Sequence, residues 1–287
     1  MKKRCKAIIT ISVVVVILVV LCLWTVWGNT ALKLNKYDIE NAKIPEDFDS
    51  FKIAHISDLH NKTFGENNSE LLDMIKNAEP DIIAITGDII DSTYTNTDIA
   101  VDFLTQAVEI APCYYVTGNH EARELEIIGE LLTTFETLGV DVLDNESVKI
   151  SKGDDDITLL GINDPSFVTD YLLGDSESVV DESLASIDID NSDFNILLSH
   201  RPELFEVYTS HNIDLTLSGH AHGGQFRLPI IGGIYAPNQG IFPKYDSGMY
   251  TKDGCSMIVS RGIGNSLFPL RFNNRPEVIL IELKTKA

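Results

Sequence analysis

Cysteine and basic residues are both scarce in this chain, and each scarcity excludes a class of protein. The four cysteines lie far apart without a C-x-x-C pair, which excludes a zinc ribbon and a thioredoxin-type site. Lys and Arg total 22 against 43 Asp and Glu, so the formal net charge is −21. Nucleic-acid backbones and anionic membrane surfaces both attract basic proteins. We therefore expect no nucleic-acid partner and no docking on anionic lipid through net charge.

What is present is the composition of a globular protein. The 287 residues are 44% hydrophobic and 23% charged, which is typical of neither a disordered nor a fibrous chain. This length allows one large domain or two small ones. The sequence leaves open whether Cys113 and Cys255 form a disulfide.

One long stretch near the N-terminus lacks charge altogether. Ala7–Trp27 contains 21 uncharged residues, and as a helix it would span about 30 Å, the thickness of a hydrocarbon core. Trp24 and Trp27 lie at its end, where interfacial aromatic residues are common. Four basic residues and no acidic one precede it. The positive-inside rule therefore places the N-terminus in the cytoplasm and the rest of the chain outside.

These features predict the division of the chain. We expect a cytoplasmic basic tip at 1–6, a transmembrane anchor at 7–27, a tether with a lead-in strand at 28–50, and a folded domain at 51–287. A cleaved signal peptide is the alternative, with an apolar core of roughly 7–15 residues and a small-residue cleavage site. The apolar core here is longer and Gly28–Ala31 is a poor cleavage site, which favours an uncleaved anchor.

From Phe51 onward, short apolar runs alternate with amphipathic stretches. Runs of four to eight residues rich in Ile, Val and Thr favour buried strands over helices. Their alternation with helices predicts an α/β protein whose sheets are covered by helices. The predicted strands are Phe51–Ser57, Asp81–Thr86, Tyr114–Thr117, Ile157–Ile162, Phe194–Ser199, Ile213–Ser218, Ser256–Ser260 and Val278–Leu283. The predicted helices are Asn68–Ala78, Thr97–Ile110, Glu121–Leu138 and Pro202–Tyr208.

Two further segments do not fit this alternation. Asp170–Asp193 holds eight acidic residues and no basic one, and we interpret it as a solvated, negatively charged excursion. Gly223–Gly254 is rich in Gly, Pro and aromatic residues, so we expect irregular structure there. Its length favours a working loop over a simple connection.

Five predicted strands end in residues that commonly bind metals. In α/β sheets the carboxyl ends of strands open onto the usual ligand crevice. A single such exit is more often a cap or a hydrogen-bonded core residue, but five of the seven histidines fall in these exits, which favours a metal site. Glycine precedes the first ligand type in three exits and permits a sharp turn with positive φ. The exits are Asp58-Leu59-His60, Gly87-Asp88, Gly118-Asn119-His120, Ser199-His200 and Gly219-His220-Ala221-His222.

The spacing and the donor types narrow the kind of site. In extended backbone, residues i and i+2 point to the same side, about 6.6–7 Å apart. Asp58 and His60 therefore share a side, as do His220 and His222, which suits one metal or two neighbouring ones. Asp, Asn and His without Cys suit Mn, Fe, Zn, Ni or Co rather than a structural thiolate site. The other two histidines, at positions 55 and 211, are expected to be structural.

Taken in order, these motifs resemble a known superfamily. The string D-x-H, G-D, G-N-H-E, H and G-H-x-H, from about Phe51 to the end, resembles that of the calcineurin-like metallophosphoesterases. With its apolar anchor, Ile56–Asn61 and Ser199–Pro202, the chain is more narrowly similar to membrane-anchored bacterial phosphoesterases of the YkuE/YaeI type. The resemblance implies a four-layer α/β/β/α sandwich with two metals at the sheet ends, preceded here by one transmembrane helix.

The resemblance also implies a role for each residue of the motifs. His120 would act beside the phosphate without binding metal, Glu121 would orient it, and Asn119 would also contact substrate. The cofactors would be two divalent ions, with Mn²⁺ favoured and Zn²⁺, Fe²⁺/Fe³⁺, Ni²⁺ and Co²⁺ as alternatives. One metal would take Asp58, His60, Asp88 and His222, and the other Asp88, Asn119, His200 and His220, with Asp88 as the bridge.

The implied activity is hydrolysis of a phosphodiester or phosphomonoester, in which a hydroxide that bridges two metals attacks phosphorus. Arg123, Arg201 and Arg261 follow exits or a strand end, and Arg201 is preferred as a phosphate ligand because it follows His200. Surface salt bridges are the alternative for all three. The anchor predicts a membrane-associated or lipid-linked substrate and a single-pass location in a bacterial cell membrane, with the catalytic domain extracytoplasmic.

The alternative function is a non-catalytic, membrane-anchored binding or scaffold module on the same fold. Scaffold members of the superfamily typically lose ligands, whereas this chain keeps every one. The sequence therefore favours the enzyme.

Overall fold

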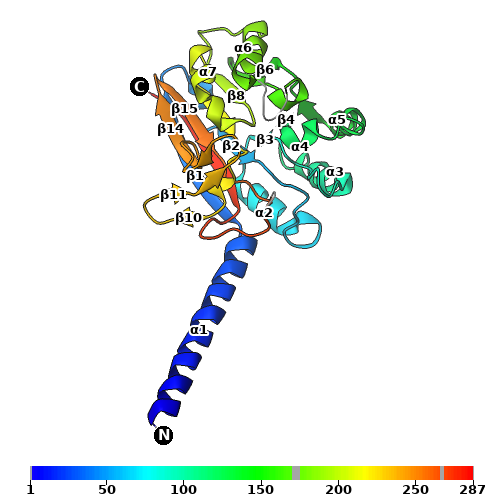
Figure 1. Cartoon of the computed structure of the whole chain (residues 1–287). Coiled ribbons are helices and arrows are strands. Elements are labelled where there is room, and N and C mark those ends of the chain that lie inside the picture. Colours follow the sequence, from blue (N-terminus) through cyan, green and yellow to red (C-terminus); the bar gives the residue numbers. More distant parts are fainter. Residues whose placement is uncertain (1, 170–174, 266–267, 287) are drawn as a thin grey trace.

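A free-standing helix and a two-sheet domain make up the molecule (Figure 1). The computed structural model describes residues 2–169, 175–265 and 268–286. The first residue of the expected basic tip and residues 170–174 of the expected acidic excursion lie outside the described residues. Helix α1 (Lys2–Thr30) contains Lys6–Thr30, which within the described chain is the one stretch long and apolar enough to cross a membrane. None of its most apolar window is buried against the domain.

The first sheet has six strands, in which the last strand of the chain lies inside rather than at an edge. β16 is antiparallel to β2, and every other neighbouring pair is parallel. In spatial order the strands are β1 (Lys33–Asn41), β16 (Glu277–Thr285), β2 (Lys52–Ile56), β3 (Ile82–Thr86), β4 (Cys113–Val116) and β5 (Val140–Val142).

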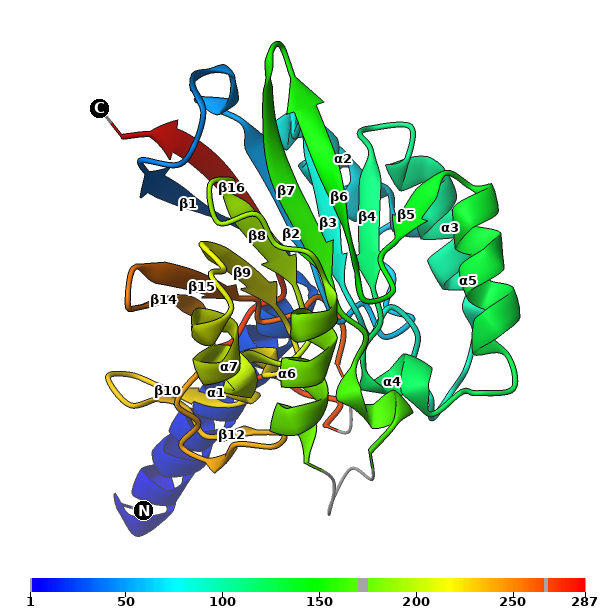
Figure 2. The same cartoon turned by 90° about the horizontal axis from the view of Figure 1, so that it is seen from above.

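The second sheet also has six strands and faces the first (Figure 2). Its central strands are parallel, and an antiparallel strand closes each edge. In spatial order they are β14 (Gly248–Lys252), β15 (Cys255–Val259), β9 (Leu215–Ser218), β8 (Asn195–Leu198), β7 (Asp155–Gly161) and β6 (Glu146–Lys152). Two small ladders follow β9: β10 (Arg227–Leu228) with β11 (Gly232–Gly233), and β12 (Tyr235–Ala236) with β13 (Gly240–Ile241).

Helices cover the outer face of each sheet, so the domain has four layers (Figure 2). α2 (Ser69–Ala78), α3 (Thr97–Ala107) and α5 (Ile128–Thr137) pack on the first sheet, and α6 (Ser176–Ser186) and α7 (Phe205–Ser210) pack on the second. A separate apolar core fills the space between the two sheets. This arrangement confirms the expected α/β/β/α sandwich.

The buried strands are continuous apolar runs because both of their faces are covered. In β3 all five residues are buried. Ile83 and Ile85 face the helices, whereas Ile82 and Ala84 face the second sheet. The same pattern accounts for all eight strands predicted from the sequence, each of which is present within a few residues of its expected bounds.

Several expectations need correction. The single helix expected at Glu121–Leu138 is divided into α4 (Asn119–Ala122) and α5, since α4 is fixed by the site described below. The described part of the acidic excursion contains α6, whose Val180 and Leu184 pack into the core. The lead-in strand expected within 28–50 corresponds to β1, an edge strand paired with β16, whereas α1 continues beyond the expected end of the anchor to Thr30.

Two histidines and two cysteines outside the motifs have plain structural surroundings. His55 is fully buried and its Nε2 lies 2.8 Å from Thr86 Oγ1; burial lowers the pKa of His55 to about 3. The Nε2 atom of His211 lies 2.7 Å from Asp181 Oδ1. Cys113 and Cys255 are both free thiols.

Candidate metal centre

The ligand-bearing loops follow strands of both sheets. β2, β3 and β4 are parallel and end at one edge of the first sheet, where the loops carrying Asp58, Asp88 and Asn119 begin. β8 and β9 end at the matching edge of the second sheet, where the loops carrying His200 and His220 begin. Because the sheets face each other, side chains from far-apart segments meet at this edge.

The backbone of these loops is held in an unusual conformation. Asp58, His60, Asp88, His220 and His222 all have positive φ, between 46° and 64°. Non-glycine residues rarely adopt this region, and a cluster of them is typical of a functional site. The left-handed conformation therefore falls on the ligand types themselves.

Glycine before the ligands serves two purposes rather than the single one we expected. Gly87 has the expected positive φ of 78°. Gly118 and Gly219 do not, and their role is close packing. A Cβ on Gly118 would overlap the carboxylate of Asp88, and one on Gly219 would overlap the side chains of Ser57 and Asp58. These glycines let one loop approach the carboxylate carried by another.

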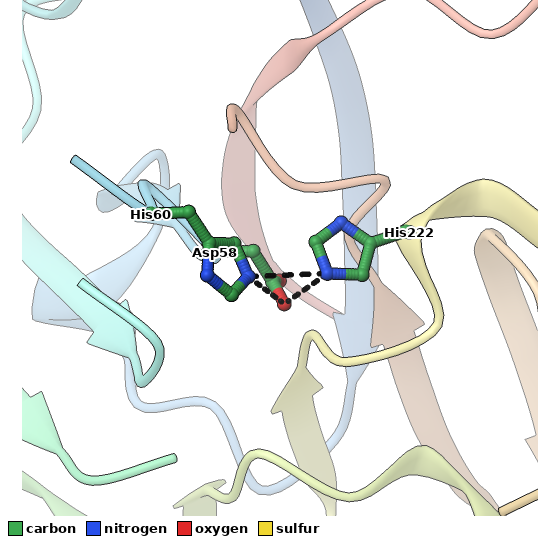
Figure 3. Close-up of side chains that lie close together, drawn as sticks. All are labelled: Asp58, His60 and His222. Carbon is green, nitrogen blue, oxygen red and sulfur yellow. Dashed lines mark hydrogen bonds and ion pairs between the residues drawn. The ribbon is translucent and has the colours of Figure 1, made fainter. Parts of the chain in front are cut away.

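The first ligand group joins the β2 and β9 loops (Figure 3). Its members are Asp58, His60 and His222, all buried. Asp58 Oδ1 lies 3.3 Å from His222 Nε2 and 3.8 Å from His60 Nε2. The two imidazole nitrogens are 3.2 Å apart. Three potential donor atoms thus point at one small space.

The second ligand group joins the β3, β8 and β9 loops. Asp88 Oδ2 lies 3.1 Å from His200 Nε2, which in turn lies 3.1 Å from His220 Nδ1. The same Asp88 oxygen is 3.6 Å from His60 Nε2, so it touches the first group as well. The backbone N–H of His120 donates to Asp88 Oδ1 at 2.8 Å, which directs the other oxygen toward both groups.

The donors present fit a pair of cations. Neighbouring imidazole nitrogens and carboxylate oxygens converge in each group, which is the arrangement of ligands around an ion. The Oδ1 atom of Asn119 is buried and has no hydrogen-bond partner within the described residues, although buried polar atoms are normally paired. The buried carboxylates of Asp58 and Asp88 outnumber the positive His200 beside them, and divalent ions would offset the remaining charge.

The charges of neighbouring side chains in the pocket stabilise one another. Burial disfavours a charged imidazole, but Asp88 outweighs it and raises the pKa of His200 to about 10. Burial likewise disfavours the Asp88 carboxylate, but the positive His200 beside it holds the pKa of Asp88 well below its usual range. Burial lowers the pKa of His60 to about 3 and raises the pKa of Asp58 to about 6. His60 is therefore neutral, as a metal-binding imidazole must be.

His120 and Glu121 lie in the site but not as the partners we expected. The Nδ1 atom of His120 accepts a hydrogen bond from the Ser92 backbone N–H at 3.0 Å, and Ser92 Oγ lies 3.1 Å away. The Glu121 carboxylate instead accepts backbone N–H groups from Gly118, Asp88 and Ile90 at 2.7, 2.8 and 3.2 Å. Glu121 therefore fixes the β3 and β4 loops against each other, and Ser92 orients His120.

Arg201 is not positioned to grip phosphate as predicted. Its side chain is 2% exposed and its Nε and Nη2 atoms donate to both oxygens of Asp164. Its Nη1 lies 2.7 Å from Asn238 Oδ1 and 3.1 Å from His220 Nε2. Burial opposes the charge, but Asp164 outweighs it and raises the pKa of Arg201. The guanidinium is bound by Asp164 and Asn238 beside His220, which leaves it buried among protein acceptors rather than open to an anion.

The other two candidate arginines have different surroundings. Arg123 is exposed and its Nη1 lies 3.5 Å from His120 Nε2, so it stands at the rim of the pocket. The Nε atom of Arg261 lies 3.6 Å from the Glu277 carboxylate, at the base of α1.

Sequence reasoning missed four residues around the pocket. Asp91, Ser92, Asn238 and Arg271 all contact the histidines of the site. Asp91 lies within 3.9 Å of both His60 and His120 and could hold a metal with them. Asp91 and Ser92 follow the G-D motif directly, and that position was the available signal. No local sequence pattern marks Asn238 or Arg271, because the fold brings Asn238 to His220 and Arg271 to His222 from distant parts of the chain.

With this geometry in view, comparison with known proteins identifies the family. Residues 51–224 match the family described as calcineurin-like phosphoesterase, over more than half of the chain. The chain therefore belongs to the calcineurin-like phosphoesterases, as the resemblance implied. The family binds divalent metals and acts on phosphate esters, which agrees with the His and Asp groups of the pocket.

Individual relatives cover most of the chain. The uncharacterized metallophosphoesterase YkuE of Bacillus subtilis strain 168 is 31% identical over 262 residues, covering 88% of this chain and 86% of its own. Phosphodiesterase YaeI of Escherichia coli strain K12 is 30% identical over 240 residues, covering 81% and 82%. The crystal structure of TT1561 of Thermus thermophilus aligns with a TM-score of 0.50 at 12% identity, covering 74% of this chain and 90% of that one. The last likeness shows the fold alone.

Proposed function

We propose that this protein hydrolyses phosphodiesters or phosphomonoesters with two divalent ions, Mn²⁺ being favoured. The observation that carries the proposal is the contact between two buried ligand groups through Asp88 Oδ2, which lies 3.1 Å from His200 Nε2 and 3.6 Å from His60 Nε2. The relationship to YaeI, which is named a phosphodiesterase, supports it. Two bound ions would stabilise charge on phosphate oxygens and provide hydroxide near neutral pH.

The side chains of the site would divide the work between holding the ions and moving a proton. The first ion would be held by Asp58, His60 and His222, the second by Asn119, His200 and His220, and Asp88 would be shared. The backbone N–H of His220 donates to both oxygens of Asp58, at 3.1 and 3.2 Å, and so aligns that carboxylate. Metal ligands that are themselves hydrogen-bonded keep their orientation.

His120 is suited to donate a proton to the departing oxygen. Its Nδ1 accepts from a backbone N–H, so in the neutral ring the proton is on Nε2. Its ring centroid lies 4.5 Å from that of His60, so it is beside the ligand groups. A positioned acid of this kind lowers the barrier by protonating the alkoxide as it leaves.

The substrate is proposed to be membrane-associated or lipid-linked. The apolar stretch of α1 is long enough to span a bilayer and is exposed along its length. We also propose that this helix is an uncleaved single-pass anchor in a bacterial cell membrane and that the catalytic domain lies outside the cytoplasm, following the basic residues before the helix.

Turnover of chromogenic esters by the full-length protein in detergent tests this function. We expect hydrolysis of bis-p-nitrophenyl phosphate that requires Mn²⁺, is abolished by EDTA and returns when Mn²⁺ is restored. Comparison with p-nitrophenyl phosphate distinguishes a diesterase from a monoesterase. Binding of Mn²⁺ without chelator-sensitive turnover of either ester would instead favour the scaffold alternative.

A further inference from the structure

We propose that the face from which α1 emerges docks on the bilayer, through exposed apolar side chains that surround the base of the helix. We call these side chains the collar; they are Leu228, Ile230, Ile231, Phe268 and Leu270. The inference rests on the proposed membrane anchor, but it does not depend on the reaction. The surface that the collar contacts is the lipid bilayer that α1 itself enters.

The collar is apolar and open to solvent. Ile230 is fully exposed at the turn between β10 and β11, and Ile231 is 59% exposed. Phe268 and Leu270 are 61% and 52% exposed. Both views place the β10–β11 hairpin beside the end of α1 (Figures 1 and 2). Contiguous exposed apolar side chains of this kind mark a protein or membrane contact.

The collar is fixed to the helix rather than merely near it. The side chain of Asn29, one residue before the end of α1, donates to the Arg271 carbonyl at 2.9 Å and accepts from the Arg271 N–H at 2.7 Å. The Arg275 guanidinium lies 4.5 Å from the Trp27 ring centroid and its Nε donates to the Ala31 carbonyl. The segment bearing Phe268 and Leu270 therefore keeps a set height relative to the helix.

The hairpin is joined to the same unit. Gln225 Nε2 donates to the carbonyls of Phe268 and Leu270 at 2.8 and 3.0 Å. The Phe226 ring packs edge-on against Phe268 with centroids 5.8 Å apart. Both halves of the collar are thus connected to the end of α1.

The charge of this face differs from that of the rest of the protein. Residues 215–245 and 254–276 contain no Asp or Glu, although the chain has 43 of them. A cavity of about 240 Å³ at the base of α1 is lined by Trp24, Trp27, Lys33, Arg261 and Arg275. Interfacial tryptophans beside cations suit the phosphate layer of a bilayer. Net charge argues against lipid docking, but the stretches that bear the collar have no acidic residue, and the neighbouring Asp246 and Glu277 are paired with Arg227 and Arg261.

Docking through the collar would also fix the orientation of the candidate metal centre relative to the membrane. The first residue of β1 lies at the same end of the sheet as the last residue of β2, since Lys33 pairs with Glu277 and Ile279 pairs with His55. Arg271, whose backbone bonds to Asn29, has its Nη2 3.5 Å from His222 Nδ1. The ligand loops and the base of α1 therefore lie at the same end of the first sheet's strands. A phosphate in the headgroup layer would then lie on the same side of the domain as the candidate metal centre.

Spin-label depth measurements test the collar. The full-length protein, with Cys5 and Cys255 changed to Ser and Cys22 to Ala, is reconstituted in phosphatidylcholine–phosphatidylglycerol vesicles; the buried Cys113 stays. A nitroxide is placed at Ile230→Cys or Leu270→Cys. The matched control is Asp154→Cys, an exposed site on the β6–β7 turn at the opposite edge of the sheets. Oxygen and Ni-EDDA accessibilities report depth.

We expect both collar labels to be reached by oxygen and protected from Ni-EDDA, at a depth of about 5–10 Å below the phosphates. The control label should be open to Ni-EDDA. Collar labels as open to Ni-EDDA as the control would overturn the proposal, and so would labels protected from both reagents, which would indicate a protein cover. Because depth is read without turnover, ester hydrolysis by the same samples tests the proposed function separately.

Discussion

The two sheets contribute different residues to the candidate metal centre and hold them by different means. The first sheet provides Asp58, Asp88 and Asn119 together with the imidazole of His60, and its loops are fixed by backbone N–H groups that donate to carboxylates. The second sheet provides only imidazoles. His220 is supported by a side chain, since Asn238 Oδ1 lies 2.9 Å from its Nε2, whereas the Nδ1 atom of His200 lies 2.7 Å from the Thr86 carbonyl oxygen.

This difference shows where each half of the site is vulnerable. A backbone clamp couples the ligands to the stability of the domain, because its loss leaves buried N–H groups unpaired. A side-chain support acts on the orientation of one imidazole and leaves the backbone intact. The first half should therefore respond to substitution in both folding and metal binding, and the second mainly in metal binding.

The largest effect is expected where the halves meet. Asp88→Asn removes the charge that both ions would share, so both should bind more weakly. The loss of affinity should exceed the roughly 10–100-fold typical of a residue that only hydrogen-bonds to a ligand. Turnover should fall below detection. Metal analysis and bis-p-nitrophenyl phosphate turnover of the full-length protein measure this. Asp73→Asn, on an exposed part of α2, is the control. One fully retained ion would show that Asp88 is not shared.

His120→Asn should separate chemistry from metal binding. We expect turnover to fall about 10²–10⁴-fold, the usual contribution of a positioned acid, while metal content stays near that of the unsubstituted protein. Parallel loss of metal and turnover would show that His120 is a ligand or a structural residue.

Glu121→Gln should break the first sheet's clamp. The amide nitrogen of Gln would face at least one of three backbone N–H donors, which costs about 1–3 kcal/mol of stability. We also expect Mn²⁺ to bind roughly 10–100-fold more weakly. Unfolding curves and titration of free Mn²⁺ by EPR test both, with exposed Glu126→Gln as control. Unchanged stability would mean that the clamp is dispensable.

Asn238→Gly should weaken the second sheet's support with a smaller effect. Glycine suits this position because φ is 56° there, so the backbone keeps its conformation. We expect about a 10-fold loss in Mn²⁺ affinity and a smaller loss of stability than in Glu121→Gln, since Arg201 Nη1 loses a single acceptor. Asn191→Ala, at an exposed site, is the control. A fall in stability equal to that of Glu121→Gln would remove the distinction between the sheets.

The smallest effect concerns His55, which lies in β2 just before the ligands but serves only the fold. Its pKa is about 3 when folded and about 6.5 when unfolded, so the unfolded chain gains a proton first as pH falls. Its contribution to stability is therefore complete above pH 6.5 and falls by about 1.4 kcal/mol per unit below it.

His55→Leu should remove this pH dependence of the unfolding free energy between pH 6.5 and 5.5. The variant should be less stable at every pH, because Thr86 loses its hydrogen-bond partner. Urea unfolding at both pH values, with saturating Mn²⁺, measures the difference. An unchanged slope would show that His55 is protonated in the folded protein.

The sequence predicted the parts of this molecule that depend on neighbours in the chain. Eight strands were found because burial on both faces makes their sequence continuously apolar. α6 was missed because only Val180 and Leu184 of its eleven residues are buried, and acidic residues dominate the rest. β6 was missed because it is an edge strand with one buried residue.

The same limit applies to the site. Asp58, Asp88 and His222 could be predicted as candidate ligands because each lies in a short local motif. The residues around His220 could not be predicted in this way. Arg201 bonds to Asp164, which is 37 positions away in the sequence, and Asn238 belongs to a segment expected to be irregular. Arg201 was assigned to phosphate from its place after His200, whereas its bonds depend on residues brought to it by the fold.

β16 affects folding during synthesis, since this strand is translated after the other described strands of the domain and lies between β1 and β2. Domains form from the N-terminal side as the ribosome adds about 5–20 residues per second. Until Glu277–Thr285 emerges, β1 has no neighbour in its sheet and β2 has an open edge. Until β16 is made, the nascent chain therefore holds a membrane helix, one unpaired strand (β1) and one strand with an open edge (β2). A nonsense mutation at Val278 would separate the helix-bearing strand from the rest of the domain.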